Sequence, residues 1–149
     1  MNKFKFRFAS VLRYREIIED NKKRDFGVAM NHLQNQESTL RAIDSSIDGH
    51  SQDTADSSQG GVSVRDLQGR YDFARKLDRD REQQEEQIAK AREEVEERRT
   101  HLVEATKQKK IFEKLEDRDR DIHEQDARKE ESMIIDEIAT QRHARKTFE

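Results

Sequence analysis

The sequence predicts an all-α fold: a long antiparallel two-helix coiled coil, or helical hairpin, with the second helix longer than the first. Charged residues make up 42% of the 149 residues, with 30 basic against 33 acidic side chains, which suits solvated helices better than a thick core. The chain contains no proline, which breaks helix interiors. Apolar residues recur at heptad spacing in two stretches that one polar stretch separates. We expect a single domain over residues 1–149.

The first helix is predicted over about 4–48. Apolar residues recur here at steps of three and four, and four of them lie seven apart, namely Phe26, Leu33, Leu40 and Ile47. The phase of Val11 and Ile18 does not join that of Phe26, so the heptad register slips near Asn21.

The loop is predicted at about 49–61. Residues 45–61 read SSIDGHSQDTADSSQGG, a stretch rich in Ser, Asp, Gln and Gly with almost no apolar side chains.

The second helix is predicted over about 62–144. One heptad position holds Leu67, Ala74, Arg81, Ile88, Val95 and Leu102, and the other holds Ala91, Arg98, Ala105 and Phe112. Folding the chain antiparallel around a midpoint near residue 55 places residue 8 beside residue 102. The second helix should then extend past the first from about Phe112 onward.

Catalysis, cofactor binding and nucleic-acid binding are not supported. The chain has no cysteine, its five histidines are dispersed without metal-ligand spacing, and Gly60-Gly61 is not followed by the Lys-Ser/Thr of a phosphate loop. Acidic residues interrupt the basic runs, as in EDRDRD at 116–121. No apolar run approaches the ~20 residues of a membrane span, and no signal peptide is evident. We therefore expect a cytoplasmic protein that is not an enzyme.

Two apolar groups exceed what the hairpin needs. Ile134, Ile135 and Ile138 form a patch beyond the reach of the first helix, which indicates either a partner-docking surface or local dimerisation. Phe4, Phe6 and Phe8 alternate with basic residues at the start of the chain. Phe4 and Phe8 share one helical face and should close the open end of the hairpin, near Leu102, Ala105 and Phe112. Either the first residues are extended, or Phe6 is available to a partner.

A third group lies at the start of the second helix. Leu77 and Gln84 fall in the heptad seam, whereas Phe73 and Asp80 fall one step to its side. Phe73 could pad the seam or reach outward to a partner.

Four segments together resemble the FliJ family of flagellar export proteins. They occur in order and at compatible spacing along nearly the whole chain: FKFRFASVLRYRE (4–16), VSVRDLQGRYDFARKLD (62–78), KKIFEKLEDRDRD (109–121) and ESMIIDEIATQR (131–142). The resemblance implies a two-helix coiled coil similar to the rotor shaft of rotary ATPases. It also implies a non-catalytic protein at the cytoplasmic face of the inner membrane, at the flagellar base.

The resemblance further implies three partners: the flagellar export ATPase ring, the cytosolic domain of the export gate, and export chaperones. In the family, an aromatic, Leu, Ala, His stripe touches the gate. Here Phe73 and Leu77 match its first two members, and Asp80 and Gln84 replace the last two. The end formed by both termini would face the ATPase, through Phe4, Phe6, Phe8, Ile134, Ile135 and Ile138.

Two alternatives compete with this interpretation. One is the equivalent stalk protein of a virulence type III secretion system. The other is a structural coiled coil that merely dimerises, and it predicts a concentration-dependent assembly. The shaft interpretation predicts a monomer, or a chain that self-associates only weakly.

Overall fold

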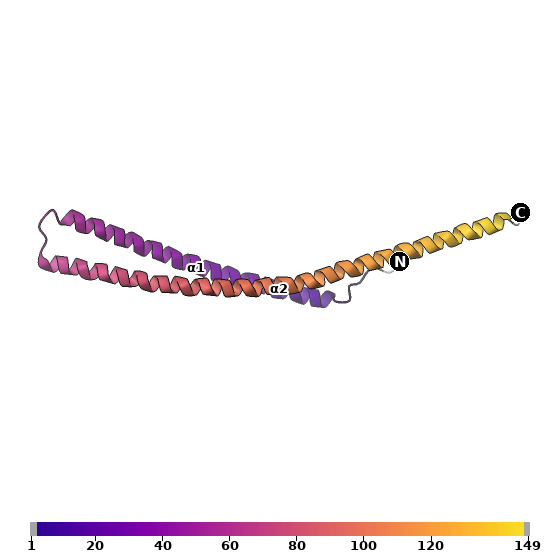
Figure 1. Ribbon diagram of the computed structural model, residues 1–149, viewed down its shortest axis with the longest axis horizontal. Coiled ribbons are helices and arrows are strands. Elements are labelled where there is room, and N and C mark those ends of the chain that lie inside the picture. Colours follow the sequence, from indigo (N-terminus) through magenta and orange to yellow (C-terminus); the bar gives the residue numbers. More distant parts are fainter. Residues whose placement is uncertain (1–2, 148–149) are drawn as a thin grey trace. The chain divides into compact units, whose positions relative to one another are not determined.

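The computed structural model describes residues 3–147, and these form two helices (Figure 1). Helix α1 runs over Ala9–Ser57 and helix α2 over Val64–Thr147. They pack antiparallel and α2 is the longer, which confirms the predicted fold class.

The described chain divides into two units. The terminal unit consists of residues 3–20 and 104–147, and the hairpin unit of residues 21–103. The division falls at Asn21, where the heptad register of the first helix slips.

Helix α1 begins at Ala9, later than the predicted start at about residue 4. Residues 3–6 are not helical, and a turn at residues 7–8 leads into the helix. The backbone N–H of Ala9 donates to the carbonyl of Phe6 at 3.3 Å, and that of Leu12 to the carbonyl of Phe8 at 2.9 Å. Phe4 and Phe6 therefore lie in a non-helical segment, and Phe8 lies in the turn that leads into the helix.

Helix α1 ends at Ser57, beyond the predicted end at about residue 48, and only residues 58–63 connect it to α2. Small polar residues prefer turns because their side chains compete for backbone groups. Here the hydroxyls bond within the helix instead: Ser46 Oγ donates to the carbonyl of Ala42 at 3.0 Å, and Thr54 Oγ1 to that of His50 at 2.8 Å.

The connection has its own turn chemistry. Gly61 has a φ of 76°, a left-handed conformation that suits glycine because it has no Cβ. Ser63 caps α2, since its Oγ accepts a hydrogen bond from the backbone N–H of Asp66 at 3.2 Å. This connection is shorter than the predicted loop and lies later in the chain. Residues of α1 therefore pair with residues further along α2 than predicted. Residue 8, expected beside residue 102, contacts Phe112 instead.

The core follows the predicted seam. In the hairpin unit Ala29, Leu77, Ile88, Ala91 and Val95 are buried, and in the terminal unit Phe6 and Ala105 are. Leu67, which the heptad pattern placed in the seam, is half exposed. The core is narrow, as expected for two helices that share one interface.

Candidate interaction surfaces

The aromatic residues at positions 4–8 pack on α2 within the terminal unit. The ring of Phe8 lies edge-to-face against Phe112, with centroids 6.2 Å apart, and Phe4 lies against His123 at 5.7 Å. Phe6 is buried and its ring contacts that of Phe8 at 5.9 Å. Phe8 thus lies against Phe112, one of the three residues expected near the N-terminal rings, and Phe6 is buried in a non-helical segment.

Guanidinium groups stabilise this cluster through cation–π contacts. Arg120 lies 5.7 Å from the ring centroid of Phe4, Arg7 lies 4.4 Å from that of Phe8, and Arg15 lies 6.0 Å from that of Phe112. Such contacts are each worth about 0.5–1 kcal/mol at exposed sites and more when desolvated. The contact between Arg120 and Phe4 joins the N-terminal segment to α2, and that between Arg15 and Phe112 joins α1 to α2.

A buried ion pair joins the two helices of the terminal unit. Nζ of Lys109 lies 3.1 Å from Oε2 of Glu19, whose side chain is 4% exposed, and 3.5 Å from Oε1 of Glu113. The hydrogen bond to Glu19 raises the pKa of Lys109, and it outweighs the opposing effect of burial. Sequence reasoning missed this pair. The signal was available: Glu19 lies seven residues after Leu12, and Lys109 seven after Leu102, so opposite charges occupy seam positions.

The isoleucines near the end of α2 are exposed. Ile134, Ile135 and Ile138 are between 46% and 59% exposed, and every other residue of 131–146 is exposed as well. These residues belong to the last part of α2, which is yellow in Figure 1. The predicted apolar patch therefore exists as a solvent-facing surface, and its partner stays a prediction.

The four residues of the predicted gate stripe do not form one exposed surface. Phe73 is exposed, and its ring lies edge-to-face against His50 at 5.0 Å. Leu77 is buried against α1. The side-chain amide of Gln84 donates to the backbone carbonyl of Gln36 at 2.9 Å and to its side-chain oxygen at 2.6 Å. Asp80 is half-buried. Leu77 and Gln84, the two predicted seam residues, therefore face α1.

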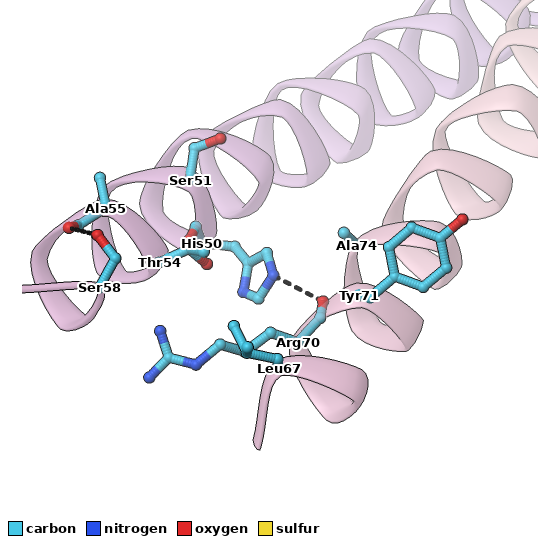
Figure 2. A pocket seen from close by; sticks show the side chains of 9 residues that line it. All are labelled: His50, Ser51, Thr54, Ala55, Ser58, Leu67, Arg70, Tyr71 and Ala74. Carbon is cyan, nitrogen blue, oxygen red and sulfur yellow. Dashed lines mark hydrogen bonds between the residues drawn. The ribbon is translucent and has the colours of Figure 1, made fainter. Parts of the chain in front are cut away.

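A cavity of about 600 Å³ lies where α1 ends and α2 begins (Figure 2). His50 crosses it, with Nε2 3.0 Å from the backbone carbonyl oxygen of Arg70. Its other lining residues are small or apolar for the most part, including Ala55, Leu67, Tyr71 and Ala74. Sequence reasoning missed it because it placed residues 49–57 in the loop.

Further along the hairpin unit, an exposed ion pair links the helices. Nε of Arg81 lies 2.7 Å from Oδ1 of Asp44, and this hydrogen bond raises the pKa of Arg81. Among residues 3–147, no group of three or more His, Cys, Asp or Glu side chains could hold a metal ion. Neither helix of this part of the chain is long and apolar enough to cross a membrane.

The two paired helices define a helical hairpin of the coiled-coil class, with an exposed apolar face near the end of α2. The family model described as the flagellar FliJ protein matches residues 4–148, and the chain belongs to this family. It is therefore a component of the flagellar export apparatus, in a family of non-catalytic structural export proteins. No curated protein and no solved structure matched the chain.

Proposed function

We propose that this chain binds the flagellar export ATPase, promotes assembly of its ring, and couples the ring to the cytosolic domain of the export gate at the flagellar base. The observation that supports ATPase binding best is the exposed face at Ile134, Ile135 and Ile138, beyond the contacts of the N-terminal segment. An apolar cluster of this kind on a helix that is otherwise highly charged favours a protein interface.

The six predicted ATPase-binding residues divide into two roles in this proposal. Phe6 is buried and Phe4 and Phe8 are half-buried, so these rings hold the N-terminal segment on α2. The isoleucines are accessible and make the direct contact with the ATPase. The aromatic cluster then acts indirectly, by keeping α2 ordered up to His123.

The gate contact is proposed for Phe73 and Asp80. These side chains are accessible or partly so, whereas Leu77 is buried and Gln84 is bonded to Gln36. Leu77 and Gln84 would hold the hairpin beneath the contact surface. The gate domain would therefore meet only two of the four residues that the family resemblance indicated.

The decisive experiment titrates the chain into the export ATPase of the same organism and reads ATP turnover and ring mass together. A variant shortened after Glu130 is the sharpest comparison, because it removes the isoleucines and retains the Phe4–His123 and Arg120–Phe4 contacts. The full chain should promote rings and turnover, and the shortened chain should do neither. Equal stimulation by both would rule out the isoleucine face as the ATPase contact.

Point variants refine the test. The double variant Ile134→Ser with Ile138→Ser should weaken ATPase binding, while Met133→Ser, at a position that is 69% exposed, is the matched control. For the gate, Phe73→Ala should weaken binding of its cytosolic domain, and the exposed Tyr71→Ala should not. The same variants, mixed with export chaperones, test whether either surface also serves them.

A further inference from the structure

The isoleucine face, defined as Ile134, Ile135 and Ile138, occupies one side of α2. At 3.6 residues per turn these three side chains fall within a sector of about 100°. Met133 points to the opposite side of the helix by the same arithmetic. No described segment of this chain covers the face, since all residues of 131–146 are exposed.

Charges flank the face asymmetrically. Glu124 and Glu131 lie on the same side of the helix before the isoleucines, with Glu130 beside them, and the one basic residue on that side at this end, Arg128, is paired with Glu124 at 3.5 Å. Arg142 and Arg145 lie on that side after the isoleucines. From its N-terminal to its C-terminal end, this side of the helix is therefore first mainly acidic, then apolar, then basic.

A second copy that runs in the opposite direction therefore presents a basic end to the acidic end of the first copy. Two copies laid antiparallel bring their isoleucines together at the centre, so that Glu131 of each copy lies beside the Arg142 end of the other. In a parallel arrangement Glu131 would face Glu131 and Arg142 would face Arg142, and like charges in register are unfavourable. Ala127 would lie opposite Arg145 in the antiparallel pair, so the small alanine leaves room for the long arginine side chain.

We infer that the occupant of this face is a second copy of the chain, paired antiparallel through residues 127–145 about a two-fold axis near residue 136. The interface is isologous, so each copy supplies the same residues and the contact closes at two copies. Only a few apolar side chains are buried in it. The pair is consequently weak and forms at high protein concentration.

The inference goes beyond the proposed function and does not rest on it, because it concerns the chain alone. The same isoleucines belong to the proposed ATPase surface, so self-pairing and ATPase binding exclude each other. Self-pairing then keeps the apolar face covered while no ATPase is bound.

Sedimentation equilibrium of the full-length chain, from low micromolar to millimolar concentration, tests self-pairing directly. Glu131→Arg and Arg142→Glu should each raise the dissociation constant about tenfold, since each places like charges together. The double variant, Glu131→Arg with Arg142→Glu, should restore it. Circular dichroism confirms that helicity is unchanged. A chain that stays monomeric over this range, or a double variant no tighter than the single ones, would overturn the inference.

Two further variants test whether the isoleucine face forms the interface. Ile134→Ser with Ile138→Ser should weaken self-pairing at least as much as one charge reversal, and Met133→Ser should leave it unchanged. If the two sets behave alike, the contact lies elsewhere and the inference fails.

The chain has no cysteine, so a single introduced cysteine can be cross-linked selectively to show whether the two copies are parallel or antiparallel. A short bismaleimide should join an Ala127→Cys chain to an Arg145→Cys chain, but should not join two Ala127→Cys chains. Efficient joining of two Ala127→Cys chains would show a parallel pair and contradict the antiparallel assignment.

Discussion

The ammonium group of Lys109 lies 3.1 Å from Oε2 of Glu19, a carboxylate whose side chain is almost fully buried between the helices of the terminal unit. A buried charge is costly unless it is paired, so removal of one partner costs more than the pair contributes. Aliphatic residues on the heptad seam could pack in several registers of the two helices. Lys109 and Glu19 can meet in only one of these registers. We infer that it helps to set the pairing of the terminal unit.

Lys109→Met should destabilise the chain by about 1–3 kcal/mol, because it leaves the Glu19 carboxylate buried without its cation. The adjacent Lys110 is exposed, and Lys110→Met is the matched control that should change stability by less than about 0.5 kcal/mol. Urea denaturation followed by circular dichroism measures both. Equal effects of the two variants would mean that the ion pair does not contribute.

The same pair predicts a pH dependence at the alkaline end. Lys109 has a pKa raised above its ordinary value of 10.5, first by its hydrogen bond to Glu19. A raised pKa means that the charged form is favoured on folding, so this stabilisation is complete below the unfolded-state value and is lost as the pH rises through the folded-state value. The difference in unfolding free energy between the wild type and Lys109→Met should be constant from neutral pH to about pH 9, and should shrink above about pH 10.5. A difference that shrinks already near neutral pH would contradict this assignment.

Val95→Ala and Val28→Ala should have opposite effects on stability. Val95 is 4% exposed and Val28 is 69% exposed, and both lie in the helices of the hairpin unit. Val95→Ala should cost about 1–2.5 kcal/mol, since it removes buried methyl groups and leaves a cavity. Val28→Ala should gain a few tenths of a kcal/mol, because alanine has the better helix propensity. Thermal unfolding of the two variants compares them, and a loss of similar size at both would be evidence against the hairpin interface described.

Phe6→Ser should release the N-terminal segment from α2. Phe6 is buried and contacts Phe8, which in turn packs on Phe112. Hydrogen exchange of α2 over residues 112–123 should become at least tenfold faster, because local opening no longer breaks these contacts. Tyr14→Ser, at an exposed aromatic residue of the same unit, should leave that exchange unchanged. Unaltered protection in Phe6→Ser would show that the segment does not stabilise α2.

Gly61→Ala and Gly69→Ala should differ in sign. Gly61 has a positive φ, and a Cβ there is strained by about 1–2 kcal/mol. Gly69 is inside α2, where a Cβ meets nothing within 4 Å, so alanine should stabilise the helix by about 0.5–1 kcal/mol. Urea midpoints of the two variants test this. Stabilisation by Gly61→Ala would require a different turn at this connection.

Periodicity and composition by themselves determined the all-α class, the antiparallel hairpin, the longer second helix and most of the seam. Ile88, Val95 and Ala105 are buried where the heptads placed them, because a helical face that carries apolar side chains at this spacing has only one stable place, against another such face. The exposed isoleucines could also be predicted, since the first helix is too short to reach them. The family resemblance rested on the order of four segments, and the family model confirmed it.

Only the tertiary structure decided the path of residues 3–8, the end of α1 and the pairing that follows from it. Where Phe4 and Phe8 lie depends on rings and a guanidinium group far away in the sequence, at His123, Arg120 and Phe112. Residues 45–57 remain helical although their composition favours a loop, since local preference is weak and neighbouring structure overrides it. The burial of Leu77 and the meeting of Glu19 with Lys109 follow from that pairing. Both depend on contacts between residues distant in sequence, which no local pattern specifies.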